Sequence, residues 1–141
     1  MSASSEASVK PIAKWQRSPA MILNVVGLVV TAAGMLLQIA AGSGLYPSLA
    51  GPIVLVVTAL IVAFGPWRWT AYIALLVPLV LGVGAIVAAA MTGEFTSQLV
   101  AFGNPGIVLG SLMHSAGLIG AVMGAIGLLR RPRHSLGDAA A

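Results

Sequence analysis

Residues 105–131 read PGIVLGSLMHSAGLIGAVMGAIGLLRR, a long uncharged stretch in which glycine keeps returning. It carries no charged residue before Arg130. About 20 apolar residues suffice for a helix to cross roughly 30 Å of bilayer hydrocarbon. Asn104 and Pro105 at its start are a typical helix N-cap and first position. The stretch therefore predicts a membrane-spanning helix over 105–129.

Three other apolar runs have the composition of spans. Ser18 and Pro19 indicate the start of the first. The second is the shortest, with Pro52 near its start, and Pro78 inside the third is expected to kink that helix. With the run described above, the predicted spans cover 19–41, 47–65, 69–91 and 105–129.

The composition allows a membrane domain and little else. Of 141 residues, 59% are apolar and 7% are charged, whereas about a quarter of a typical soluble domain is charged. We expect an all-α polytopic protein, with four transmembrane helices in one antiparallel bundle over 19–129. It lies between an N-terminal tail, 1–18, expected to be mostly disordered, and a basic then disordered C-terminal tail, 130–141.

The basic residues predict the orientation. Of the seven Lys and Arg residues, three lie in the N-terminal tail, three lie in the C-terminal tail, and one, Arg68, lies in the second loop. By the positive-inside rule both termini are cytoplasmic, and so few, scattered cations do not indicate nucleic-acid binding. The Ala, Gly and Val richness and absence of cysteine fit a bacterial plasma (inner) membrane. The alternative, a cleaved signal peptide, is disfavoured because 19–41 exceeds the usual apolar core of roughly 7 to 15 residues.

The glycines of the fourth span recur every seven residues in two adjoining rows. One row holds Gly110, Gly117 and Gly124, and the other holds Gly106, Gly120 and Gly127 together with Met113. Small residues let helices approach closely in lipid, and a seven-residue period indicates a left-handed crossing. Gly27 and Gly34 in the first span share this period. We expect these glycines to form a helix-packing face, the alternative being that glycine is merely common in such spans.

Matching depths along the two helices predicts how they meet. With the first and fourth spans antiparallel, Gly27 lies level with Ala121, and Gly34 lies near Met113 and His114. The alternative is that the glycine face of the fourth span turns outward and forms a homodimer.

Polar side chains accompany the glycines. Asn24, Thr31 and Gln38 lie seven residues apart in the first span, and His114 is the only histidine in any predicted span, none of which contains Asp, Glu, Lys or Arg. Polar groups are unfavourable against lipid, so we expect them to face protein and to bond across helices, with His114 within one turn of Thr31. They are also candidate ligand-binding residues. An imidazole can ligate haem, although a bis-histidine site would need a second histidine from a partner or a second copy.

Motifs for catalysis are absent. Ser111 lies one helical turn before His114, but no acid orients the histidine and no G-x-S-x-G motif is present. No metal-binding or nucleotide-binding motif occurs either. The sequence predicts that the protein is not an enzyme and holds no metal.

Two functional hypotheses remain. The first is a non-catalytic accessory or assembly subunit, or a homo-oligomer, that acts through helix contacts. The second is a carrier or binding protein for a small apolar molecule, lipid or haem, lined by Asn24, Thr31, Gln38 and His114. The expected partners are membrane lipid and another membrane protein or a second copy of the chain.

Overall fold

The structure, a computed structural model, describes residues 18–43, 48–65, 69–92 and 103–130. These residues form helices and no strand: α1 (Pro19–Ala40), α2 (Ala50–Phe64), α3 (Thr70–Thr92) and α5 (Pro105–Leu129). The predicted tails, apart from Ser18 and Arg130, and the turn at Arg68 lie outside the described residues. The prediction of an all-helical protein is confirmed.

Three of these helices, α1, α3 and α5, are long and apolar enough to cross a membrane. α2 has 15 residues, about 22 Å, and is shorter than the predicted 47–65 segment. It begins at Ala50, which places Pro52 in the first turn. Backbone N–H groups of the first turn have no acceptor within the helix, so a proline there costs no helical hydrogen bond. Pro47, the predicted start of this span, lies outside the described residues, and the helix as described begins at Ala50.

Side chains of the predicted capping residues close the starts of α1 and α5. The Met21 N–H donates to Ser18 Oγ over 3.2 Å. At α5, the Gly106 N–H donates to Asn104 Oδ1 over 3.0 Å. The amide of Asn104 also donates to the Ala41 carbonyl over 3.1 Å, which joins the start of α5 to the end of α1.

The end of α1 is a Schellman motif that sets the helix boundary at Ala40. Gly42 has φ +80°, a left-handed conformation suited to glycine. The Ser43 N–H donates to the Gln38 carbonyl over 2.9 Å, and the Gly42 N–H donates to the Ile39 carbonyl over 3.0 Å. These bonds satisfy carbonyls that a helix end would otherwise leave free.

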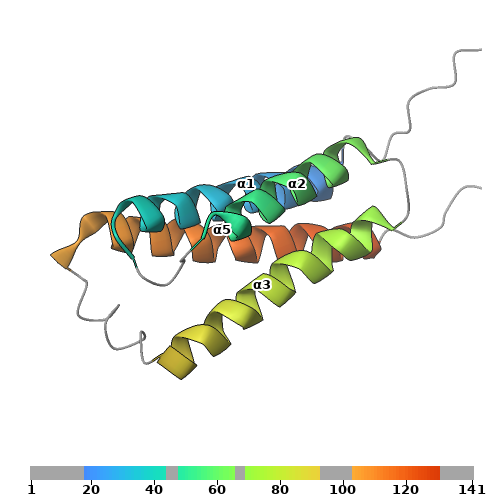
Figure 1. Ribbon diagram of the computed structural model, residues 1–141. Coiled ribbons are helices and arrows are strands. Elements are labelled where there is room, and N and C mark those ends of the chain that lie inside the picture. The colour runs from blue at the N-terminus through green and yellow to red at the C-terminus, as the bar shows by residue number, and fades with distance from the viewer. Residues whose placement is uncertain (1–17, 44–47, 66–68, 93–102, 131–141) are drawn as a thin grey trace, which may run out of the picture.

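The helices are arranged around α1 and α5 (Figure 1). α1 makes its most extensive contact with α5, α2 packs on α1, and α3 packs on α5 and α2. One buried cluster draws a residue from each helix, namely Met21, Val62, Ala74 and Ala125. In Figure 1 the Thr92 end of α3 diverges from the other helices.

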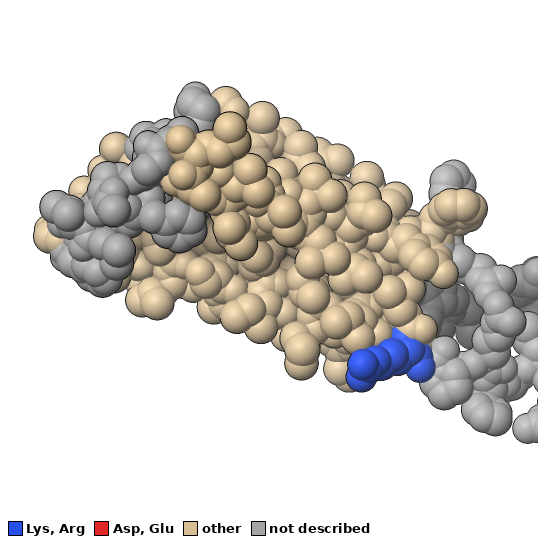
Figure 2. Space-filling model, turned by 90° about the horizontal axis from the view of Figure 1, so that it is seen from below, with Lys and Arg blue, Asp and Glu red and all other residues tan. Residues whose placement is uncertain are grey.

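The outer surface of the helices is apolar. Figure 2 shows one face that carries no acidic side chain and a single basic group at one end. Arg130 is the one Lys or Arg in the described ranges. Large aliphatic side chains on α1, α2, α3 and α5 are exposed, as expected for helices that meet lipid tails rather than water.

Candidate functional site

The contact between α1 and α5 is a seam in which two backbones touch. A Cβ atom built on Gly34 would lie 2.6 Å from the His114 nitrogen and 2.7 Å from the Gly110 carbonyl oxygen. One built on Gly27 would lie 2.6 Å from the Gly117 carbonyl oxygen and would overlap the backbone of Ala121. This is the pairing that depth matching predicts.

The other glycines of α5 also face α1. A Cβ on Gly110 would meet the Gly34 carbonyl at 2.8 Å, and one on Gly124 would meet the Ala20 carbonyl at 2.6 Å. In the second row the nearest atoms are the Ala41 Cβ at 2.9 Å from Gly106, the Gly27 Cα at 3.7 Å from Gly120 and the Ala20 Cβ at 3.0 Å from Gly127. α1 of the same chain therefore buries the row of Gly110, Gly117 and Gly124, while the second row is partly buried against it.

The order of the pairs gives the direction of the two helices. Ala20 lies against Gly127, Gly34 against His114 and Ala41 against Gly106. Residue numbers rise along α1 as they fall along α5, so these two helices are antiparallel.

Asn24 connects three helices from a position with no exposed surface. Its Nδ2 donates to the Ala121 carbonyl of α5 over 2.6 Å and to the Ala74 carbonyl of α3 over 3.4 Å. Its Oδ1 is buried without a hydrogen-bond partner among the described residues. The expected bonding of this amide across helices is present.

Thr31 and Gln38 lie on the same buried face of α1 but make no cross-helix bond of this kind in the described part of the chain. The Thr31 hydroxyl donates to the Gly27 carbonyl of its own helix over 2.8 Å. Its proton is therefore not donated to His114. Gln38 is 2% exposed, and its Oε1 is buried without a partner among the described residues.

His114 is half-buried on α5, with its backbone against Gly34. It is the one histidine in the described ranges, so they supply no second histidine for a bis-histidine haem site. Nor do these residues contain a group of three or more His, Cys, Asp or Glu that could hold a metal ion.

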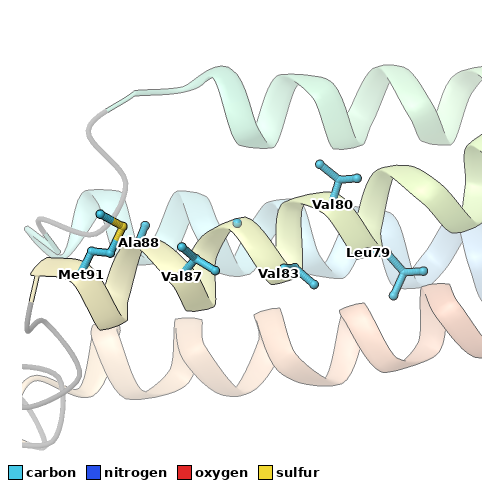
Figure 3. A pocket seen from close by; sticks show the side chains of 7 residues that line it. Leu79, Val80, Val83, Val87, Ala88 and Met91 are labelled. Carbon is cyan, nitrogen blue, oxygen red and sulfur yellow. The ribbon is translucent and has the colours of Figure 1, made fainter.

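An open groove of about 620 Å³ runs along α3 (Figure 3). It is lined by Leu79, Val80, Val83, Gly84, Val87, Ala88 and Met91. A Cβ on Gly84 would meet nothing within 4 Å. The groove is not lined by any of the predicted ligand-binding residues, namely Asn24, Thr31, Gln38 and His114. The one sequence signal for it was the four-residue spacing of Gly84 and Ala88.

Comparison with known protein families, characterised proteins and solved structures finds no significant match to this chain.

Proposed function

We propose that the protein is a non-catalytic integral membrane protein that acts through helix contacts, as an accessory or assembly subunit of a larger complex or as a homo-oligomer. The contact surface is the groove on α3. The observation that supports this most directly is a contrast between glycines: Gly110, Gly117 and Gly124 of α5 are buried against α1, whereas a Cβ on Gly84 would meet nothing within 4 Å.

The physics of helix association in lipid supports this surface. Lipid tails are as apolar as leucine, so helices associate through close van der Waals contact, which small residues permit. The small residues of the groove are Gly84 and Ala88, which lie four residues apart. Its aliphatic lining includes Val80, Val83 and Val87. Such a shape fits the side-chain ridge of another transmembrane helix.

The same proposal includes a place and an orientation. The chain forms a four-helix antiparallel bundle in a plasma membrane, and both termini are cytoplasmic, as the distribution of Lys and Arg favours. A reporter fused after Ala141 is expected to be active only as a cytoplasmic enzyme, and an extracytoplasmic reporter signal would reject the orientation.

The second candidate is a carrier of an apolar molecule, held in the groove rather than among the buried polar residues. Two observations favour it. Every residue that lines the groove is apolar. The volume of the groove also falls in the range of roughly 300 to 1,000 Å³ that is usual for ligand sites. An acyl chain has the matching shape and chemistry.

Purification in mild detergent from native membranes tests both candidates. For the native chain and for Gly84→Ile, we would measure the mass of the particle, the co-purifying proteins, the bound lipid and the visible absorbance. An isoleucine at residue 84 fills the groove, whereas Ala116→Ile changes an exposed small residue of α5 outside it and serves as the matched control.

Loss of a protein partner or of the oligomer in Gly84→Ile alone supports the helix-contact proposal. Loss of a stoichiometric lipid from a monomer supports the carrier. A native chain that purifies as a bare monomer without partner or lipid rejects both. A Soret band that disappears in His114→Ala would instead establish haem.

A further inference from the structure

Pro78 interrupts the hydrogen bonding of α3 at a buried position. The helix continues through it from Thr70 to Thr92, and the proline side chain is less than 2% exposed. Proline has no N–H, so the carbonyl four residues earlier, that of Ala74, loses its donor within the helix. Ala74 is fully buried, which keeps both water and headgroups from that carbonyl.

Asn24 of α1 reaches this same carbonyl. Its Nδ2 lies 3.4 Å from the Ala74 oxygen, a long bond, and 2.6 Å from the Ala121 oxygen. The Ala121 carbonyl lies inside α5, which contains no proline in that part and supplies its own donor. Free backbone groups at membrane depth need hydrogen-bond partners, and a side chain of a neighbouring helix can supply one. We propose that Asn24 supplies the donor that Pro78 lacks and so anchors a hinge in α3.

The two halves of α3 differ in the way such a hinge requires. Before Pro78, Ala74 belongs to the cluster that joins all the described helices. After it, Leu81 packs against a buried cluster that includes Leu28 and Leu55, and Gly82 lies against Leu118, but the helix end is open, with Met91 83% exposed. A hinge at Pro78 would move 79–92 relative to 70–77 by loosening the contacts of Leu81 and Gly82. Because every residue that lines the groove lies on 79–91, a pivot about Pro78 moves the whole groove relative to the other helices.

A double-mutant cycle tests the anchor. Pro78→Ala restores an N–H for the Ala74 carbonyl, and Asn24→Leu removes the amide in either background. The bond to Ala121 is lost equally in both, so it cancels. We expect Asn24→Leu to lower the folding equilibrium constant about threefold more in the native chain than in Pro78→Ala, the size typical of interhelical bonds. Asn24→Ala replaces Asn24→Leu if the latter does not fold. Equal losses in the two backgrounds overturn the anchor.

Paired spin labels test the hinge. The exposed pair Met91 and Leu109 reports on the second half of α3, and the pair Tyr72 and Met123 reports on the first half as the matched control. We expect Asn24→Leu to broaden the Met91–Leu109 distance distribution and Pro78→Ala to narrow it, with the control pair unchanged. If neither variant alters the Met91–Leu109 distribution, or if both pairs change alike, the hinge is rejected.

Discussion

Gly34 and His114 meet backbone to backbone: a Cβ on Gly34 would lie 2.6 Å from the His114 nitrogen and 3.1 Å from its Cα. No side chain could yield at this point, because the opposing atoms belong to a helix backbone. The seam between α1 and α5 thus requires that residue 34 has no side chain.

Gly34→Ala is expected to destabilise the protein by about 1–3 kcal/mol, the usual range for overpacking, because the helices must separate. Gly84→Ala is the control: its Cβ meets nothing, so it should be neutral or stabilising by up to about 1 kcal/mol. Reversible unfolding in mixed micelles measures both. Equal stabilities of the two variants would contradict the seam.

Cysteine pairs at the ends of the seam should crosslink within one chain. The Ala20 Cβ would lie 3.0 Å from a Cβ on Gly127, and the Ala41 Cβ 2.9 Å from one on Gly106. Both are slightly below the usual disulfide separation of about 3.8 Å, so a small shift suffices. The chain has no native cysteine to interfere.

Gel mobility of oxidised monomers measures these crosslinks. The mismatched pair of cysteines at Ala20 and Gly106, at opposite ends of the seam, is the control and should not react. Disulfides found only between chains would refute the intramolecular contact. Cysteines placed at Gly27 and Ala121 themselves are a poor choice, because a side chain at Gly27 overlaps the α5 backbone.

Gln38→Met is expected to leave stability unchanged or to raise it. The Gln38 Oε1 is buried without a partner among the described residues, and replacing an unsatisfied polar group by an apolar one of similar shape removes a desolvation penalty of about 1–3 kcal/mol. Unfolding in mixed micelles checks this, with the cross-bonded Asn24→Leu as the contrasting variant. A loss of stability as large as that of Asn24→Leu would show that Gln38 has an essential partner.

Asn104→Ala is expected to destabilise more than Ser18→Ala. Each change removes a side-chain cap worth about 1 kcal/mol, but Asn104 also donates to the Ala41 carbonyl at the end of α1. Asn104→Asp keeps the cap acceptor and loses only that donor, so it should fall between Asn104→Ala and the native chain. Thermal unfolding in detergent ranks the variants, and equal effects of the two alanine changes would contradict a double role for Asn104.

Features that depend on capping residues or on a regular spacing of residues along one helix could be predicted from the sequence. The start of α5 at Pro105, its end at Leu129, and the pairing of Gly27 with Ala121 all follow from capping residues, seven-residue spacing and helical rise. These signals are local or repeat along one helix, so one chain carries them without knowledge of its neighbours.

The features that depend on a third helix could not be predicted. Whether Asn24 bonds to α3 as well as α5, and whether Gly84 remains uncovered, depend on where α3 crosses the α1–α5 pair. The start of the second helix could not be placed from the sequence, because Pro47 and Pro52 both suit a helix start and the sequence does not choose between them. Ligand binding by His114 stays a prediction.

The 15 residues of α2 have a consequence for the surrounding bilayer. In the proposed four-span topology its apolar length falls about 8 Å short of a hydrocarbon layer of about 30 Å. Lipids beside α2 must shorten or tilt to cover the mismatch, at fractions of a kcal/mol per Å, and this strain grows with membrane thickness. The lipid layer should therefore be thinner beside α2 than beside α1, α3 and α5, which have 22, 23 and 25 residues, so that one short helix makes the bilayer around the bundle uneven.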